Sequence, residues 1–453
     1  MDFVNRSDYP LPRSSAHVQN EVSHTRSAGP LRNRSFLHYL GQSGLSRLAS
    51  SVWAVCLVWF VFAETGSAIA VGVVSISETL AVIAVGLPAG HLVDRYSRRG
   101  LMLTSHLIRA GGLLVLAFLA GAFGYQLGFV LVVVVALSAA TELNRSVAHA
   151  LLPDVVEPSD LADANGLENS LSSSLAAVAS AAGGGLIVLV GVDWGFGFAA
   201  LAYAFAAVLT YVGVHPRAGF DHPSARGALA HDGFLASIRA GVRYLVSQAG
   251  LLQLSLSAMV FNFVFYLTWS FLVIYVTEGL SQGSLALGLL LAVYAAGTMV
   301  GNLVVGRTSA LRNAGRIWVL GYGFVGGFLL LLLGAFPYLP LALADLVLMG
   351  LSLGFAGNVW LTSAQNLVPT EMRGRYFALD GLLSWIAGPP AIALGAVLIA
   401  LWGVDATFRY AGIAMAVAAA LFLLPRSLRR LDGRVQDPLP RSPRPDGAPS
   451  SPM

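Results

Sequence analysis

The stretch Gly90-His91-Leu92-Val93-Asp94-Arg95-Tyr96-Ser97-Arg98-Arg99 lies between two long apolar runs and carries four formal charges. A short charged segment between two runs that can each cross a bilayer is typical of a loop joining two membrane-spanning helices. The rest of the chain repeats this pattern, because 56% of its 453 residues are hydrophobic and only 11% are charged. The runs are continuously apolar and do not alternate as barrel strands do. We therefore expect an all-α polytopic membrane protein.

Apolar runs of about 20 residues predict the membrane spans. They give twelve transmembrane helices, at residues 36–63, 68–90, 100–123, 125–145, 165–191, 193–214, 250–277, 284–306, 315–336, 338–365, 375–401 and 403–425. The polar break at 215–249 divides them six and six, which predicts two six-helix bundles, residues 36–214 and 250–425. Weak repeats between the halves, such as Leu152-Pro153 and Val368-Pro369, indicate pseudo-symmetry.

The segments outside the bundles carry their own expectations. Residues 1–35 are predicted to be a cytoplasmic tail, and residues 426–453, rich in Pro and Arg, a disordered one. In the linker 215–249, apolar residues from Phe234 to Leu245 recur at helical spacing, with Arg239 and Arg243 on another face. This pattern predicts an amphipathic helix on the inner membrane surface, or an ordinary connector.

The basic residues orient the chain, and all 27 of them are arginine. Arg47, Arg109 and Arg409 fall within predicted spans, and the others lie in the tails and in the loops of one side only. Cytoplasmic loops retain basic residues, so both termini are predicted to be cytoplasmic, in a cell (inner) membrane. The pI near 9.3 therefore requires no nucleic-acid partner.

The sequence lacks the residues that several classes of chemistry require. Without lysine there is no Walker-type ATP motor and no Schiff-base enzyme. The single cysteine, Cys56, lies in a predicted span, which leaves no intrachain disulfide and no cysteine-rich metal site. The histidines form no His-Glu-x-x-His pattern. The sequence predicts neither an enzyme nor a metal or cofactor site.

Four charged residues fall deep within the predicted spans, where charges are costly and usually functional. Glu78 lies about ten residues into the second span, near the midplane at 1.5 Å per residue. It is interpreted as a proton or cationic-substrate site, or else as a hydrogen-bonded structural carboxyl, and Asp345 in the tenth span is a second proton-site candidate. Arg47 and Arg109 could be the counter-charge that tunes Glu78, or could bind an anionic substrate.

A substrate cavity is expected on the seventh and tenth spans. Asn262, Tyr266 and Trp269 share one face of the seventh span, with Phe265 close by, and Asn358 and Gln365 add amides in the tenth. An aromatic cavity with a few polar groups suits a bulky amphipathic molecule. The alternative is that these aromatic side chains only pack against neighbouring helices or lipid.

The sequence resembles a known family in several motifs. Gly90-x-x-x-Asp94-Arg95-x-Ser97-Arg98-Arg99 is similar to the signature loop between the second and third helices of the major facilitator superfamily, with Ser97 where glycine is usual. Further matches are Glu64-Thr65-Gly66-Ser67-Ala68 and Val368-Pro369-x-Glu371-x-Arg373-Gly374-Arg375. Together they resemble the branch that holds siderophore exporters of the enterobactin type and macrolide efflux pumps.

The resemblance implies a conformational latch at the cytoplasmic face. Asp94 would meet the N-terminal end of the eleventh helix, whose dipole favours an anion, while Arg95, Arg98 and Arg99 would pair with carboxylates or lipid phosphates. Glu142 is the candidate acidic partner, because it lies at the inner end of the fourth span. The remaining members of the predicted latch are Gly90, Arg373, Gly374, Arg375 and Asp380.

The function expected from these features is proton-coupled efflux of an amphipathic drug-like or secondary-metabolite compound by alternating access. Export of a siderophore or other anionic metabolite is the alternative, and a non-transporting membrane sensor or lipid-modifying enzyme is a third hypothesis. The expected partners are a small-molecule substrate, protons and the lipid bilayer, with the protein as a monomer.

Overall fold

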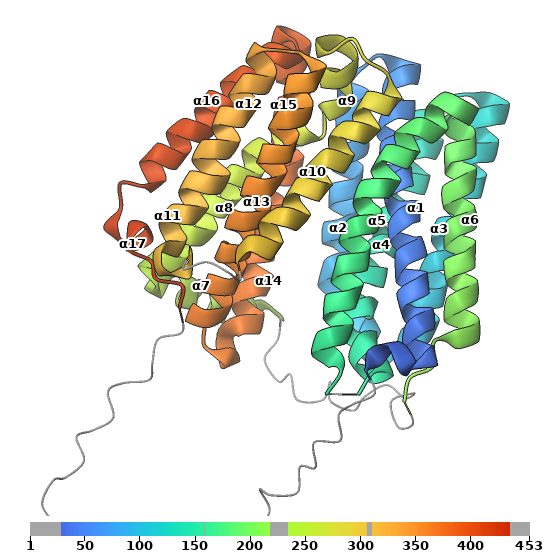
Figure 1. The fold of residues 1–453 in the computed structure, drawn as a ribbon, viewed down its shortest axis with the longest axis horizontal. Coiled ribbons are helices and arrows are strands. Elements are labelled where there is room, and N and C mark those ends of the chain that lie inside the picture. The colour runs from blue at the N-terminus through green and yellow to red at the C-terminus, as the bar shows by residue number, and fades with distance from the viewer. Residues whose placement is uncertain (1–28, 158, 218–233, 306–309, 435–453) are drawn as a thin grey trace, which may run out of the picture.

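The computed structural model describes residues 29–157, 159–217, 234–305 and 310–434. Within these ranges the chain forms helices and no strand. Twelve spans among the described residues are long and apolar enough to cross a membrane, which confirms the predicted fold class. Figure 1 shows two bundles side by side, blue to green and yellow to red along the chain.

The first bundle contains one helix per span. Its helices are α1 (Arg34–Thr65), α2 (Ala68–Arg95), α3 (Arg98–Phe123), α4 (Leu127–Val155), α5 (Leu161–Val190) and α6 (Val192–Gly213). In its core, α1 packs on α6 so closely that a Cβ at Gly195 would lie 2.5 Å from the Sγ of Cys56, which is fully buried.

The charged stretch at 90–99 is mostly helical and not a loop. Helix α2 continues through Arg95, and α3 begins at Arg98, so only Tyr96 and Ser97 lie between them. Ser97 is the N-cap of α3, and its Oγ accepts a hydrogen bond from the Gly100 N–H at 3.2 Å. A serine favours this cap position, so the departure from glycine has a local role.

The second bundle contains two interrupted spans. Its helices are α8 (Ala249–Trp269), α10 (Ser284–Val305), α11 (Ala314–Trp318) continued by the π-helix η6 (Val319–Val325) and α12 (Gly326–Ala335), α13 (Leu339–Leu367), α14 (Thr370–Ile386) continued by α15 (Gly388–Trp402), and α16 (Val404–Phe422). The break between α14 and α15 falls at Ala387, before Gly388-Pro389-Pro390. Proline cannot donate the backbone hydrogen bond that a continuous helix needs.

The seventh span is shorter than expected. The sequence predicts a helix over 250–277, but α8 ends at Trp269. The chain then turns into the short helix α9 (Leu272–Ile274) and the π-helix η4 (Tyr275–Gly279). The 3-10 helices η2 (Pro30–Arg32) and η5 (Ala310–Asn313) precede α1 and α11.

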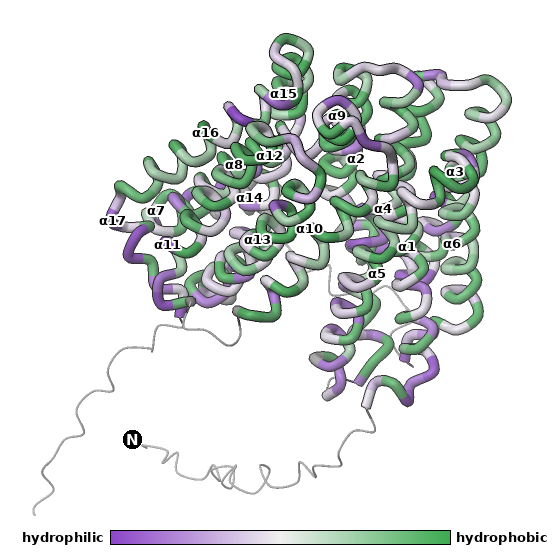
Figure 2. The backbone as a smooth tube through the Cα atoms, turned by 45° about the horizontal axis from the view of Figure 1, so that its top comes forward, coloured by the Kyte–Doolittle hydropathy of each residue, from purple (hydrophilic) through white to green (hydrophobic). Residues whose placement is uncertain are grey.

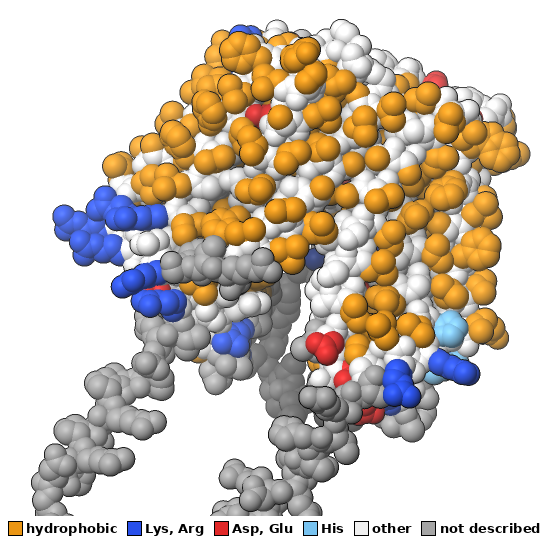
Figure 3. All heavy atoms as spheres, viewed as in Figure 1, with side chains coloured by type: hydrophobic (Ala, Val, Ile, Leu, Met, Phe, Trp, Pro, Cys, Tyr) orange, Lys and Arg blue, Asp and Glu red, His pale blue; other side chains and the backbone are white. Residues whose placement is uncertain are grey.

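Polar residues gather at one end of the molecule. Figure 2 shows hydrophilic stretches at the lower helix ends of both bundles, and Figure 3 shows arginine and acidic side chains in the same region. We call this the basic end; it carries Arg98, Arg99, Arg217, Arg316 and Arg426.

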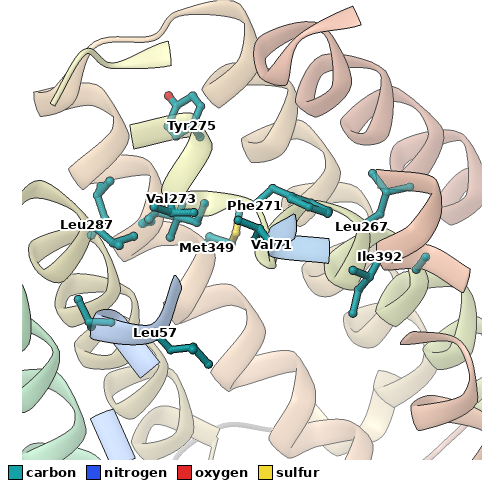
Figure 4. Close-up of a cluster of buried hydrophobic side chains, with 14 of the residues drawn as sticks. Leu57, Val71, Leu267, Phe271, Val273, Tyr275, Leu287, Met349 and Ile392 are labelled. Atoms are coloured by element: carbon teal, nitrogen blue, oxygen red, sulfur yellow. The ribbon is translucent and has the colours of Figure 1, made fainter. Parts of the chain in front are cut away.

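The bundles are in contact toward the end opposite the basic end. There the Oγ of Ser284 in α10 donates to the carbonyl of Gly184 in α5 at 3.2 Å. A Cβ at Gly72 of α2 would lie 3.1 Å from the Cβ of Ala396 in α15. Figure 4 shows an apolar cluster here, to which both bundles contribute, including Leu57 and Phe271. Toward the basic end the two bundles part (Figures 1 and 3).

The structure describes the first part, residues 426–434, of the tail that the sequence analysis predicts at 426–453. Helix α17 (Arg426–Arg429) follows α16, and Leu428 is fully buried. The N–H of Gly433 donates to the carbonyl of Leu311 at 2.7 Å, and Asn366 donates to the carbonyl of Gly433 at 2.9 Å. Burial of apolar side chains such as Leu428 stabilises these contacts. We call residues 426–434 the C-terminal strap; residues 435–453 lie outside the described part.

The linker between the bundles contains helix α7 (Phe234–Ser247), which packs on α14. A Cβ at Gly241 would lie 3.2 Å from the carbonyl oxygen of Arg375. Leu245 is buried, whereas Arg239, Val242 and Arg243 are exposed. The side chains of 234–238 lie outside the described part.

Candidate functional site: an aromatic cavity beside a charged bundle

A cavity of about 450 Å³ opens in the second bundle between α8, α10, η6 and α13. Six aromatic residues from these elements and α11 line it, together with three asparagines: Phe265, Tyr266, Tyr294, Trp318, Tyr322 and Trp360, with Asn262, Asn302 and Asn358. Of the six residues predicted to form a substrate cavity, four are in this wall: Asn262, Phe265, Tyr266 and Asn358. The other two, Trp269 and Gln365, are not among the lining residues.

The aromatic side chains of the wall support one another. Trp269 stacks on Phe265 with ring centroids 5.0 Å apart, and its ring centroid lies 4.4 Å from that of Tyr294. Trp269 therefore stands behind the wall as a support. Gln365 is exposed and lies about two turns further along α13 than Asn358, on the same face, so it lies beyond the cavity and not in its wall.

The polar groups of the cavity are mostly paired. The hydroxyl of Tyr322 donates to Oδ1 of Asn262 at 2.9 Å, and Asn358 donates to the carbonyl of Asn302 at 3.2 Å. The indole N–H of Trp360 is buried and has no hydrogen-bond partner among the described residues. An unpaired buried donor is costly, so this N–H is available to an acceptor on a bound molecule.

The two arginines predicted to lie deep within spans differ in their surroundings. Arg47 is exposed and makes no hydrogen bond or ion pair with another described residue. Arg109 is 1% exposed in the interior of the first bundle, with its guanidinium carbon 4.3 Å from the ring centroid of Tyr203. It donates to Oγ of Ser46 at 3.2 Å and to Nδ1 of His106 at 2.8 Å. Arg109 therefore does not face a substrate path.

The hydrogen bonds around Arg109 determine the state of His106. Because Arg109 can only donate, Nδ1 of His106 must accept, and Nε2 carries the proton. Nε2 lies 2.9 Å from Oε1 of Gln42, which accepts it. No carboxylate forms an ion pair with Arg109 among the described residues. A cation–π contact with Tyr203 and hydrogen bonds to neutral acceptors stabilise the Arg109 guanidinium.

Neither acidic proton-site candidate has a hydrogen-bond or ion-pair partner in the part of the chain that the structure describes. Asp345 in α13 is 2% exposed, and neither of its carboxyl oxygens has a hydrogen-bond partner among the described residues. Glu78 in α2 is half-buried and makes no hydrogen bond or ion pair with a described residue. The two carboxyls lie in different bundles.

The predicted latch forms contacts within the first bundle. Arg98 forms an ion pair with Asp154 of α4 at 2.6 Å and donates to the carbonyl of Ala150 at 3.1 Å. Arg99 donates to the carbonyl of Thr210 at 3.4 Å. Arg95 is exposed. These contacts fasten the start of α3 to α4 and α6.

Glu142 has a different partner from the one expected. It pairs with Arg145, one turn further along α4, at 2.7 Å. Arg98 instead uses Asp154, which the sequence analysis did not single out. The two partners are 56 positions apart in the sequence, so no local pattern signals the pair.

Of the remaining latch residues, Gly90 and Asp94 are in α2, and the others are in α14. Arg373 donates to the carbonyl of Val368 at 3.1 Å, and Nη1 of Arg375 lies 4.0 Å from the sulfur of Met372. Asp380 is 4% exposed, and its Oδ1 has no partner among the described residues. The side-chain positions of Gly90, Asp94 and Gly374 lie outside the described part.

A second acidic residue of the first bundle, besides Asp154, was missed by the sequence analysis. Oε1 of Glu168 in α5 accepts hydrogen bonds from Ser43 of α1 at 2.8 Å and from Ser172 at 3.1 Å. Glu168 lies at the start of the predicted fifth span, 165–191, and its serine partner on α1 is 125 positions away, so no local pattern singles it out. No group of three or more His, Cys, Asp or Glu side chains in the described ranges could hold a metal ion.

Comparison with known proteins gives one family match. The family model described as Major Facilitator Superfamily matches residues 40–391. The chain is 23% identical over 399 residues to macrolide efflux protein A of Streptococcus pyogenes, covering 87% of this chain and 96% of that protein. It is 25% identical over 392 residues to the multidrug efflux pump Tap of Mycolicibacterium fortuitum, covering 84% and 93%.

Solved structures share the fold at low identity. A bacterial homolog of the human lysosomal transporter Spinster, in an inward-facing and unoccupied conformation, has a TM-score of 0.66 at 16% identity, covering 90% of this chain and 99% of that one. A point mutant of the nucleoside transporter NupG has a TM-score of 0.69 at 13% identity, covering 86% and 99%.

Proposed function

The chain belongs to the Major Facilitator Superfamily of membrane transporters, and from that membership we propose that it exports a bulky amphipathic compound in exchange for protons. The observation that carries this proposal is the cavity of about 450 Å³ with six aromatic and three asparagine side chains. Rigid apolar walls with a few amides accept large organic molecules. Similarity to a macrolide efflux protein and a multidrug efflux pump supports the direction and the substrate class.

We assign the basic end to the cytoplasm, because arginine is retained on that side of a membrane. The bundles part at this end and are in contact at the opposite end. This arrangement corresponds to a state open to the cytoplasm, in which a monomer in the cell membrane would load its substrate for export. Alternating access would then open the contacts around Gly184 and Ser284.

Proton coupling is assigned to Asp345 and Glu78. A buried carboxylate without a partner costs several kcal/mol, so we propose that Asp345 holds its proton in this conformation. Glu78, in the first bundle, would exchange a proton with the solvent at the basic end, where the bundles part. Arg47, exposed in the same bundle, is the available counter-charge, whereas Arg109 is enclosed by neutral partners.

The pairs Arg98–Asp154 and Glu142–Arg145 are proposed as the resting arrangement of the latch. In the opposite state, Asp94 would engage the start of α14, near Arg373 and Arg375. The alternative of an anionic substrate loses one of its two candidate arginines, since Arg109 makes all its contacts inside the first bundle, and Arg47 alone would have to bind the anion.

Flux of a fluorescent amphipathic dye from proteoliposomes under an imposed pH gradient tests the proposal. Tyr294→Ala removes one wall of the cavity and should reduce flux at least about tenfold, as truncation of a central aromatic contact commonly costs about 2 kcal/mol or more. Tyr410→Ala, on an exposed tyrosine of α16, is the matched control and should leave flux unchanged. Equal flux in both variants, or none in the wild type, contradicts the assignment.

A further inference from the structure

Five arginines gather on the second bundle at the basic end. They come from η5, from α11 and from the C-terminal strap: Arg312, Arg316, Arg426, Arg429 and Arg430. None of their guanidinium groups makes a hydrogen bond or an ion pair with a described residue. The single acid of the strap, Asp432, instead pairs with Arg434 at 2.6 Å. We call these five residues the arginine patch.

The contacts of the strap hold the arginine patch together. Oε1 of Gln253 in α8 accepts hydrogen bonds from Oγ of Ser427 at 2.6 Å and from the N–H of Leu428 at 3.1 Å. A Cβ at Gly315 of α11 would collide with the carbonyl oxygen of Leu428, which places Arg316 beside the strap. Orientation in the membrane requires only that arginine be present on this side. The patch is in addition a built surface, with its charges fixed next to one another.

The arginine patch borders apolar side chains that face outward. The N–H of Arg430 donates to the carbonyl of Arg426 at 3.0 Å, which puts these two exposed arginines on one face of the strap. Just before them, Leu421 and Leu424 at the end of the last span are 59% and 71% exposed. Figure 3 shows arginine side chains at this edge of the second bundle with hydrophobic side chains directly above them. This boundary between apolar and basic surface lies at the depth of the lipid headgroups.

We propose that the arginine patch binds the headgroup phosphate of an anionic phospholipid, whose acyl chains lie against Leu421 and Leu424. A guanidinium group binds phosphate oxygens through two parallel N–H bonds. The lipid must carry a net negative charge, because the ammonium of a zwitterionic headgroup would be repelled by the five arginines. The exposed leucines favour a lipid over a free phosphate, which has no apolar part to place there. This site is independent of the transported substrate.

Two lipids with the same acyl chains test this assignment, with binding measured by native mass spectrometry on the purified full chain in detergent. Dioleoylphosphatidylglycerol should bind at least about tenfold more tightly than dioleoylphosphatidylcholine. The double variant Arg426→Gln with Arg430→Gln should weaken phosphatidylglycerol about 25-fold, since each arginine near the lipid contributes about fivefold. It should leave phosphatidylcholine within about twofold. Both side chains are exposed, and the bonds of Gln253 to the strap do not involve them.

Arg32→Gln with Arg34→Gln is the matched control, because it removes two exposed arginines just before and at the start of α1 and changes the net charge equally. It should leave both affinities unchanged. Equal weakening of phosphatidylglycerol by the two double variants would mean diffuse attraction and would overturn the site, as would equal binding of the two lipids by the wild type. Inorganic phosphate at constant ionic strength should not displace phosphatidylglycerol, and displacement would overturn the lipid as the ligand. None of these outcomes bears on the export function.

Discussion

Arg47 and Arg109 are both single charges within spans, yet the structure gives them opposite surroundings. Arg47 is exposed, whereas Arg109 is 1% exposed beneath Tyr203 and holds His106 in one tautomer. Their sequence neighbourhoods are alike, because each lies about one turn after a serine on an apolar helix. Helix rotation within the bundle decides between them, and tertiary packing sets that rotation.

Replacing Arg109 by methionine should destabilise the fold without changing substrate affinity. The variant leaves the acceptor atoms of Ser46 and His106 buried without a hydrogen-bond donor. Each unsatisfied group costs about 1–3 kcal/mol of folding free energy. We expect the thermal midpoint in detergent to fall by several degrees. Arg47→Met should leave the midpoint nearly unchanged, as exposed substitutions usually do. A weaker substrate affinity with an unchanged midpoint would contradict the structural role of Arg109.

Asp345→Asn should separate coupling from transport. The amide is neutral at all pH values and nearly isosteric, so we expect downhill equilibration of substrate to remain within about threefold. Uphill accumulation driven by a pH gradient should fall at least about tenfold, since no proton can be carried there. Substrate flux measured without and with the pH gradient gives the downhill equilibration and the uphill accumulation, respectively.

Asp193→Asn, an exposed acid at the start of α6, is the control for the Asp345 variant. It should behave as the wild type in both assays. If Asp345→Asn still accumulates substrate fully, Glu78 or another group carries the proton.

At the scale of elements, the spans were predictable and their partners were not. The length of an apolar run is a local signal, and every expected span has a counterpart among the described helices. Tyr294, Tyr322 and Trp360 of the cavity wall come from three different segments, and each alone reads as an ordinary membrane aromatic. Asp154 became visible as a partner only once α3 and α4 were packed together.

The C-terminal strap should stabilise the basic end of the second bundle. Leu428 is fully buried, so Leu428→Ala is expected to cost about 2–5 kcal/mol. Limited proteolysis should then cut near residue 430 faster, with a lower thermal midpoint. Leu424→Ala, at a leucine that is 71% exposed, should do neither. An unchanged cleavage rate for Leu428→Ala would show that the strap does not hold this end.

The strap should not respond to pH in the physiological range. The hydrogen bond from Arg434 lowers the pKa of Asp432 from 3.8 to about 2. A lowered pKa means that the pair persists above the ordinary carboxyl value and is lost only as the pH falls toward about 2. A change in transport between about pH 5 and 8 therefore arises from the titration of a group other than Asp432.

For the whole molecule, we expect the contact between α5 and α10 to set the balance between the two proposed open states. A Cβ at Gly288 would lie 2.6 Å from the carbonyl oxygen of Ser180, so Gly288→Val cannot be accommodated while the bundles touch. Overpacking costs about 1–3 kcal/mol, which shifts the population about 5–150-fold toward the state that is open at this end.

Hydrogen exchange measures this shift. Amides near the outer ends of α5 and α10 should exchange faster in Gly288→Val than in the wild type. Gly185→Val is the matched control, because a Cβ at Gly185 meets nothing within 4 Å. Equal protection of these amides from exchange in the two variants would mean that the close approach at Gly288 does not limit the separation of α5 and α10.

The burial of Cys56 against Gly195 has a practical consequence for following these motions. The chain contains a single thiol, and it is fully buried, so maleimide and nitroxide reagents find no accessible target on the folded protein. Pairs of cysteines can be introduced into the native sequence, one in each bundle, and labelled with spin probes without a background signal. The distances between them would report the opening of either end in the otherwise unaltered transporter.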